Sequence, residues 1–266
     1  MLGKDFYFQL IRKYIVTFGK LFDNINITRT DASNNAVTIV RVPLTYANKD
    51  KFLTRVNQDP TITQQAAIVL PRMSFELGGL KYDGSRKLNT VGRIAVPSDS
   101  PNTMKTIFNP VAYDINFLLY VYVKNAEDGT KIIEQILPFF TPDFTPTVHL
   151  IPEMDITMDI PVILNGAVNI TDNYDGSFID RRVMIWQLDF TMRAWLYGPV
   201  REKPIIKFVK TELFVDSQMQ SEPVVTVTVQ PGLDADGNPT SILENSVDVN
   251  TIWATDDYGF VEKVEE

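Results

Sequence analysis

The start of the chain carries apolar side chains at intervals of three and four positions. That spacing gathers them on one face of a helix, so the pattern predicts a helix over residues 5–22. Asp5 stands where it can cap the first turn, and Gly19 weakens the last turn. The face is rich in aromatic rings and is expected to pack into a core; its members are Tyr7, Leu10, Ile11, Tyr14, Ile15, Phe18, Leu21 and Phe22.

A second helix is predicted over residues 126–137. Ile132, Ile133 and Ile136 fall on one side of that helix, and polar side chains fall on the other. Pro138 has no backbone N–H to continue the helix, so the helix ends there. The aromatic stretch that follows, residues 139–144, is expected to pin the end of the helix to a sheet.

Alternation of apolar and polar positions predicts strands over much of the remaining chain. Residues 25–30 and 36–43 flank a polar turn and form a hairpin. Residues 111–123 form a long strand whose second face carries tyrosines, which indicates that both faces are covered. Residues 160–170 and 183–196 form an antiparallel pair. We therefore expect an α+β fold: a mixed, mainly antiparallel β-sheet with two packed helices and an extended acidic C-terminal arm.

Two segments lack a pattern that would bury them. Residues 91–110 show little periodicity and contain several Pro and Asn residues, so we expect a long loop there. Beyond Ser217 the composition changes, and Pro-Gly and Asp-Gly turns interrupt a short β-prone run. We place a boundary near this point, between a body of residues 1–217 and an acidic extension of residues 218–266.

The negative charge is concentrated at the C-terminal end. Residues 211–266 hold 12 acidic residues and one basic residue, whereas residues 1–210 hold 21 acidic and 24 basic residues. The net charge of the body is then +3, which argues against nucleic-acid binding, because phosphate contacts need clustered Lys and Arg. The acidic segment is either a solvated arm or an arm that docks on a neighbouring subunit. No run of about 18 apolar residues is present, so no membrane contact is expected.

The chain offers little chemistry for catalysis. It has no Cys and a single His, His149, so a thiolate nucleophile, a disulfide and a sulfur metal site are excluded. No Gly-x-Ser-x-Gly elbow and no phosphate-binding glycine loop occur. We expect His149 to have a structural or surface role, and we expect no enzyme activity, cofactor or metal.

Acidic clusters leave two minor alternatives. The Asp-rich loops at residues 172–180 and 234–238 fail the register of a calcium loop, because its first and twelfth positions are not acidic; a turn is the favoured interpretation. Glu153, Asp155 and Asp159 could act as paired carboxylates of a hydrolase. They stand in a Pro-flanked connector, which makes catalysis the weaker interpretation.

Candidate interface residues follow from the enrichment of Arg and aromatic residues in binding hot spots. The unpatterned segments, residues 91–110 and the chain beyond residue 217, are the candidate interface regions. The residues that we select as a candidate protein interface are Arg72, Arg93, Lys105, Arg181, Arg182 and Trp253.

Several sequence blocks together resemble the tail sheath stabiliser and completion proteins of T-even-like contractile phages. The blocks occur in family order over roughly residues 1–200. They are residues 19–25 (GKLFDNI), 40–47 (VRVPLTYA), 68–72 (IVLPR), 133–144 (IEQILPFFTPDF), and the stretch from Arg181-Arg182 through Trp186 to residues 195–200 (WLYGPV).

The resemblance implies a virion protein without catalytic residues. It implies a homohexameric ring at the head-proximal end of the tail, assembled in the host cytoplasm. Such a ring terminates the tail, stabilises the extended sheath, and contacts the tail sheath protein, the tube terminator and the neck or head-completion proteins. The alternative is a β-rich carbohydrate- or protein-binding module of another virion component.

Overall fold

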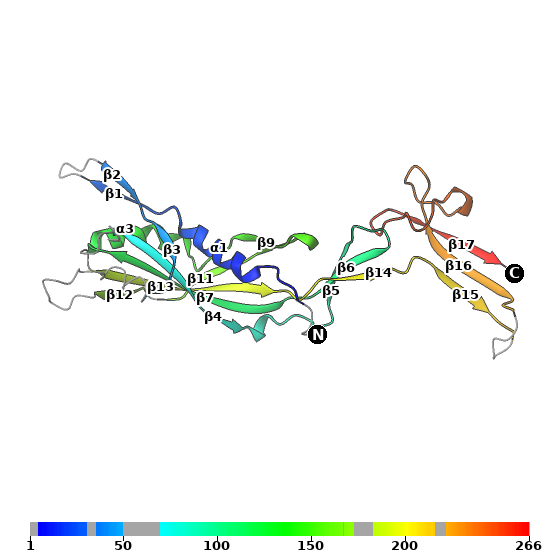
Figure 1. Ribbon diagram of the computed structural model, residues 1–266, viewed down its shortest axis with the longest axis horizontal. Coiled ribbons are helices and arrows are strands. Elements are labelled where there is room, and N and C mark those ends of the chain that lie inside the picture. The colour runs from blue at the N-terminus through cyan, green and yellow to red at the C-terminus, as the bar shows by residue number, and fades with distance from the viewer. Residues whose placement is uncertain are drawn as a thin grey trace. The chain divides into compact units, whose positions relative to one another are not determined.

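Contacts divide the computed structural model of the chain into two compact units (Figure 1). The first unit contains residues 1–88 and 110–196, and the second contains residues 89–109 and 197–266. The division at residue 217, between a body and an acidic extension, stays a prediction. The structure describes residues 5–30, 36–49, 70–166, 168–172, 183–215 and 222–265.

A seven-stranded sheet forms the centre of the first unit. Its two longest strands, β7 and β13, pair antiparallel over their whole length, from Val111 opposite Leu196 to Val123 opposite Met184. All pairs in this sheet are antiparallel except that of β3 with β4, so the sheet is mixed, as expected. Its strands are β3 (Leu44–Tyr46), β4 (Arg72–Tyr82), β7 (Val111–Val123), β8 (Asp143–Phe144), β11 (Val162–Leu164), β12 (Asn169–Asp172) and β13 (Met184–Leu196).

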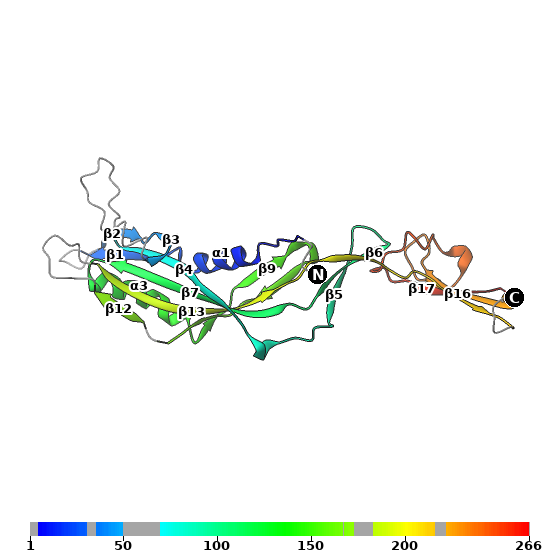
Figure 2. The same cartoon turned by 60° about the horizontal axis from the view of Figure 1, so that its bottom comes forward.

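Helix α1 (Leu10–Phe22) packs on this sheet through every fourth residue (Figure 2). Leu10, Tyr14, Phe18 and Phe22 are buried, and the Phe18 ring stacks on Phe117 of β7 with centroids 4.4 Å apart. The predicted start at residue 5 is wrong. Gln9 precedes the helix in the left-handed region, with φ 56°, and this turns the chain out of the helix before Asp5 could act as a cap.

Helix α3 (Ala126–Ile136) confirms the second predicted helix, with Ile132, Ile133 and Ile136 buried. A 3₁₀ turn, η2 (Leu137–Phe139), follows it. The aromatic stretch beyond the helix reaches the sheet as expected, because the Phe140 ring lies 5.1 Å from the ring of Phe190 on β13. Sequence periodicity was sufficient here because the helix buries one regular stripe.

The described part of the first unit also contains two hairpins. The predicted N-terminal hairpin is confirmed as β1 (Asn26–Thr30) and β2 (Ala36–Arg41). Strands β9 (Thr147–Ile151) and β10 (Ile156–Asp159) form the other, joined by the 3₁₀ turn η3 (Pro152–Met154). A further 3₁₀ turn, η1 (Gly84–Arg86), follows β4.

The second unit holds two three-stranded antiparallel sheets. The loop expected over residues 91–110 is wrong, because this segment forms a hairpin that pairs with β14. The extended acidic arm is not confirmed, since residues 222–265 supply two strands of the other sheet. The first sheet contains β5 (Arg93–Pro97), β6 (Thr103–Phe108) and β14 (Arg201–Pro204); the second contains β15 (Val209–Leu213), β16 (Val225–Gly232) and β17 (Gly259–Glu265), with a 3₁₀ turn, η4 (Leu243–Asn245), between its last two strands.

The two helices and the mixed sheet agree with the α+β class predicted from the sequence. Across the part of the chain that the structure describes, no helix combines the length and the apolar character needed to cross a membrane.

Candidate protein interfaces

The acidic connector of the first unit does not converge on a site. Asp159 accepts a hydrogen bond of 2.6 Å from the Thr147 hydroxyl, and Glu153 is exposed on η3. His149 lies 3.5 Å from Asp155, with both side chains largely in solvent. No group of three or more His, Asp or Glu side chains could hold a metal ion among the residues that the structure describes.

The Asp-rich loop after β16 is a turn held by one carboxylate. Asp234 accepts hydrogen bonds from the backbone N–H groups of Asp236 and Asn238, at 3.0 and 2.7 Å. The N–H of Asn238 is the main reason that the pKa of Asp234 is lowered, because the bond favours the charged form. These contacts agree with the turn interpretation. The other Asp-rich loop lies outside the described residues after Asp172.

One face of the β5–β6–β14 sheet gathers cations. The register places Arg93 opposite Phe108 and Arg201 opposite Thr106, and alternation along the strands puts all of these on the same side. Lys203 of β14 joins them there. We call this surface the basic face; it consists of Arg93, Ala95, Pro97, Met104, Thr106, Phe108, Arg201 and Lys203.

The Phe108 ring orders two of these cations. The guanidinium groups of Arg93 and Arg201 lie 4.8 and 5.5 Å from its centroid. Such contacts contribute about 0.5–1 kcal/mol each at exposed sites. Within the described residues, no salt bridge involves Arg93, Arg201 or Lys203, and all three side chains are exposed. The basic face therefore presents positive charge that is available to an acidic partner.

Lys105 lies on the opposite face of the same sheet. It is opposite Glu202 in the register, and its ammonium group is 2.9 Å from the carboxylate of Asp99. Only 16% of its side chain is exposed. Lys105 therefore stabilises the β5–β6 hairpin by an ion pair, and it does not extend the basic face.

The β15–β16–β17 sheet has one apolar side and one polar side. The polar side carries the ion pairs Lys210–Glu212 and Lys263–Glu265. On the other side, 64% of Phe260 and 59% of Val264 are exposed. We call this side the apolar face; it consists of Val209, Leu213, Val225, Val227, Val229, Pro231, Phe260 and Val264, with the exposed polar residues Thr211 and Glu262 among them.

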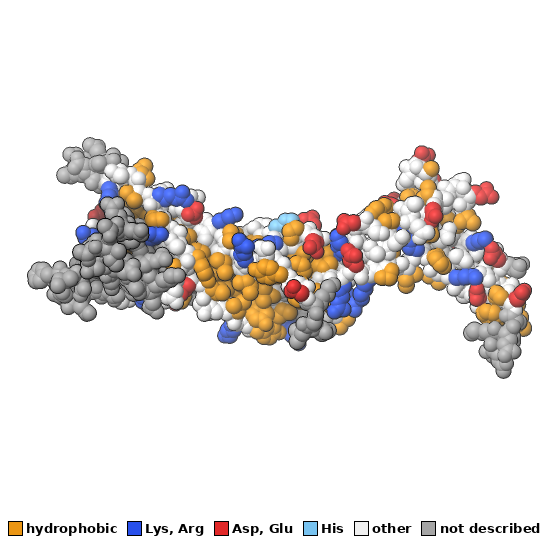
Figure 3. Space-filling model, in the orientation of Figure 1, with side chains coloured by type: hydrophobic (Ala, Val, Ile, Leu, Met, Phe, Trp, Pro, Cys, Tyr) orange, Lys and Arg blue, Asp and Glu red, His pale blue; other side chains and the backbone are white. Residues whose placement is uncertain are grey.

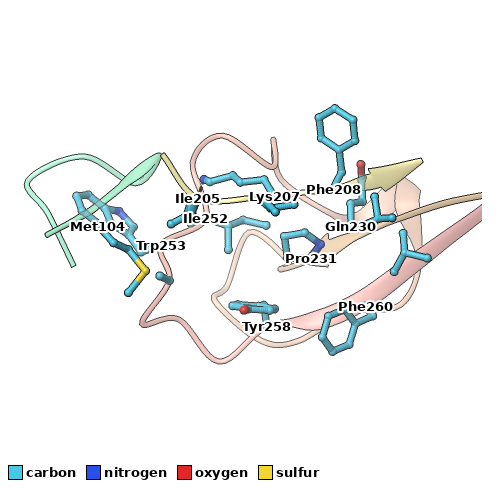
Figure 4. Close-up of a pocket in the computed structure, with 14 residues that line it drawn as sticks. Met104, Ile205, Lys207, Phe208, Gln230, Pro231, Ile252, Trp253, Tyr258 and Phe260 are labelled. Atoms are coloured by element: carbon cyan, nitrogen blue, oxygen red, sulfur yellow. Dashed lines mark hydrogen bonds between the residues drawn. The ribbon is translucent and has the colours of Figure 1, made fainter. Parts of the chain in front are cut away.

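The apolar face continues into a hollow of about 350 Å³ within the second unit. Figure 4 shows Met104 and Trp253 at one end of this hollow, and Phe208 and Phe260 at the other. Lys207 connects two segments beside this hollow, because its ammonium group donates hydrogen bonds to the carbonyls of Val249 and Ile252, at 2.8 and 2.7 Å. Burial lowers the pKa of Lys207, and the nearby acids Asp248 and Asp256 oppose that shift.

The first unit exposes apolar surface as well. Apolar side chains gather over α1 and the neighbouring strands in Figure 3. Val16 of α1 is 48% exposed. A further hollow, of about 470 Å³, lies where α1 meets the end of α3, and Phe139 at its rim is 65% exposed. Exposed apolar patches of this kind mark sites of protein–protein contact.

Residues 5–258 match a family described as T4-like virus Myoviridae tail sheath stabiliser. The chain belongs to this family. It is also 31% identical over 202 residues to the tail completion protein gp15 of Enterobacteria phage T4, and the match covers 73% of each chain. The protein is therefore a structural component of a contractile phage tail, and the expectation that it is not an enzyme is confirmed by its family.

The family match extends further than the sequence blocks suggested. The resemblance was placed on roughly residues 1–200, yet the match continues to residue 258. It therefore includes β15 and β16, and with them most of the apolar face.

The candidate interface residues selected from the sequence lie in separate places. Arg72 lies in β4, where a guanidinium N–H donates to the Thr45 hydroxyl at 3.0 Å. Arg93 is on the basic face, and Trp253, which is 36% exposed, lines the hollow beside the apolar face. Arg181 and Arg182 lie outside the described residues. The interface role of these residues stays a prediction for a protein of this family.

Sequence reasoning missed most residues of the basic face and of the apolar face, because pairing of strands brings the residues of each face together. Arg201 and Lys203 were not selected, because nothing local links them to a hairpin about a hundred positions earlier. The apolar face had a clear signal in the alternation of residues 225–229 (VTVTV), which is typical of a strand with one buried side.

Proposed function

We propose that this protein forms a homohexameric ring at the head-proximal end of the tail. The ring terminates the tail, keeps the sheath in its extended state, and connects the tail to the neck. Its partners are then the tail sheath protein, the tube terminator and the neck or head-completion proteins. The proposal needs no direct reading of nucleic acid and no membrane, and it places assembly in the host cytoplasm.

The proposed mechanism is thermodynamic. A ring that binds extended sheath subunits more tightly than contracted ones shifts the equilibrium towards the extended sheath by that difference in affinity. A preference of about 1.4 kcal/mol in each contact is a factor of ten, and six equivalent contacts multiply their factors. A modest preference in each subunit would thus hold the last sheath layer extended.

The observation that supports this proposal most directly is the pair of unlike exposed surfaces on the second unit. The basic face and the apolar face differ in chemistry and lie on different sheets. A subunit with two different binding surfaces can contact two different neighbours, which is what a closed ring with heterologous interfaces requires. The family described as tail sheath stabiliser, and the relative named as a tail completion protein, support the location in the tail.

The test uses the purified full chain. Light scattering coupled to size exclusion should give a mass near six copies at high protein concentration. Adding the chain to tube–sheath assemblies should then slow the contraction that urea induces, in proportion to the number of tails that carry a ring. A chain that stays monomeric and leaves the contraction rate unchanged would contradict the proposal.

The mass measurement and the contraction assay also distinguish the proposed ring from the alternative function. A carbohydrate-binding module of another virion component would bind sugar without the ring mass and without any effect on sheath contraction. Binding of a glycan array by a monomeric chain would favour that alternative.

A further inference from the structure

We infer that neighbouring copies in the ring contact each other through the second unit, with the apolar face of one copy and its Glu262 against the basic face of the next. This inference rests on the proposed ring and specifies which surfaces form it. It commits to a second copy of this chain as the occupant of both faces.

The apolar face needs a cover that its own unit does not supply. Antiparallel sheets alternate apolar and polar positions where one side is buried, and β16 alternates Val and Thr from Val225 to Val229. Strands β15 and β17 add apolar side chains to the Val side, together with Thr211 and Glu262. Phe260 and Val264 are nevertheless more than half exposed. The alternation therefore indicates burial in an assembly.

The size of the apolar face limits what can cover it. Three strands of five to eight residues make a surface of about 20 by 14 Å, on the order of 300 Å². A stable interface buries about 800 Å² on each partner. The contact must therefore extend beyond this face, into the hollow beside it and over a charged surface of the partner.

Charge complementarity identifies the partner surface. Residues 222–265 hold nine acidic residues and one basic residue, Lys263, which is paired with Glu265. Glu262 projects on the apolar face and forms no salt bridge with the described residues. The basic face offers three exposed cations, two of which, Arg93 and Arg201, lie over the Phe108 ring. An acidic apolar surface and a basic aromatic surface complement each other in both properties.

Symmetry favours this pairing over contact between two identical faces. Two apolar faces packed on each other would be related by a two-fold axis, which closes a dimer and stops there. They would also bring Glu262 of both copies together. Pairing of unlike faces leaves one of each free at every step, so it continues around a ring until the ring closes.

Charge reversal tests the contact. Glu262→Arg and Arg201→Glu should each raise the protein concentration needed for half-maximal ring formation at least tenfold, measured by light scattering at low salt. In the chain with both reversals, the concentration for half-maximal ring formation should return to within about threefold of wild type. Every interface would then pair an Arg at position 262 with a Glu at position 201 of the next copy. Far-UV circular dichroism and thermal melts confirm that each variant is folded.

Glu265→Arg is the matched control. It makes the same change in the same strand, but on the polar side of the sheet, so ring formation should not change. Phe260→Ser should weaken the ring without any charge change, while Ile242→Ser, at a similarly exposed position outside the sheet, should not.

The outcomes separate this inference from the proposed function. A wild-type ring that tolerates both single reversals overturns the inferred contact and leaves the ring intact. Loss of sheath protection in a variant that still forms rings also overturns it, because the face would then belong to a tail partner. A chain that never self-associates contradicts the ring and the contact together.

Discussion

The hydroxyl group of Tyr14 on α1 contacts the backbone of Trp195 on β13 twice. It donates a hydrogen bond of 2.6 Å to the carbonyl and accepts one of 3.2 Å from the N–H. Tyr14 is completely buried, and the two residues are 181 positions apart in the chain. This contact fixes the helix to one end of the longest strand pair of the first unit.

Replacing Tyr14 by Phe should destabilise the first unit. The ring would still fill its place, but the backbone groups of Trp195 would lose their partner in a buried site. A cost of about 1–3 kcal/mol is expected in the free energy of unfolding, measured in urea. Tyr7→Phe removes the same hydroxyl from a side chain that is 74% exposed, and should change stability by less than about 0.5 kcal/mol. Equal stability of the two variants would contradict the assigned role.

Phe18 is expected to be the most sensitive core position of α1. Its ring lies within 5.4 Å of the rings of Phe22, Phe75, Phe117 and Phe190. Phe18→Ala should lower the free energy of unfolding by about 3–5 kcal/mol, because it leaves a cavity at the meeting point of helix and sheet. Val16→Ala, on the exposed side of the helix, is the control and should have little effect. A small loss at Phe18 would mean that the helix is not anchored there.

The elements that the sequence predicted well are those whose pattern is local. Helix α3 buries one regular stripe, and β7 is a long apolar run that is buried on both faces towards its end, so the local pattern alone was sufficient. The start of α1 was predicted too early because Tyr7 matches the apolar spacing of the helix. The helix begins only after Gln9, because the backbone of Gln9 is left-handed. The spacing of apolar residues carries no information about this change of backbone conformation.

The second unit was predicted poorly because its sheets depend on pairing between distant segments. Strand β6 pairs with β14, which lies about 95 positions further along the chain. The Thr106 hydroxyl, for example, donates a hydrogen bond to the carbonyl of Arg201. Strand β17 follows β16 only after a long loop, and its Glu and Lys residues made it resemble a solvated tail. The basic face could not be predicted for the same reason, since Arg93 and Arg201 meet only around Phe108.

Asp83 should make the stability of the first unit depend on pH. Its carboxylate accepts bonds from the hydroxyl and N–H of Ser85 and pairs with Arg86 at 2.6 Å, and Arg86 also pairs with Asp114 at 2.8 Å. The bond from Ser85, followed by that from Arg86, holds the pKa of Asp83 well below its usual range. A lowered pKa means that the folded state binds protons less readily than the unfolded state.

The resulting stabilisation is fully present above the unfolded pKa of about 4 and is lost as pH falls through the folded pKa. Asp83→Asn should therefore be less stable than wild type at pH 7, and the difference should shrink steadily below about pH 4. Urea unfolding at several pH values measures it. Asp5→Asn, at an exposed position before α1, is the control for the substitution itself and should change stability at pH 7 by less than about 0.5 kcal/mol. A difference that stays constant with pH would contradict the assignment.

Gly129 of α3 faces the indole of Trp186 on β13, and this contact should reverse the usual effect of a helical glycine. Alanine normally stabilises a helix interior by about 1 kcal/mol relative to glycine. A Cβ at position 129, however, would lie 2.5 Å from the Trp186 Nε1 atom, closer than a Cβ approaches any non-bonded heavy atom in folded proteins. Gly129→Ala should therefore lower the free energy of unfolding, by about 1–3 kcal/mol for an overpacked contact.

A double-mutant cycle separates this clash from a general effect on α3. Trp186→Phe removes the indole nitrogen, so adding Gly129→Ala to that variant should cost less than it does in the wild type, with a coupling of at least about 0.5 kcal/mol. Thr130→Ala changes the neighbouring exposed position of the helix and should show no coupling to Trp186. If Gly129→Ala stabilises the protein and shows no coupling, the close approach of α3 to β13 at this point is wrong.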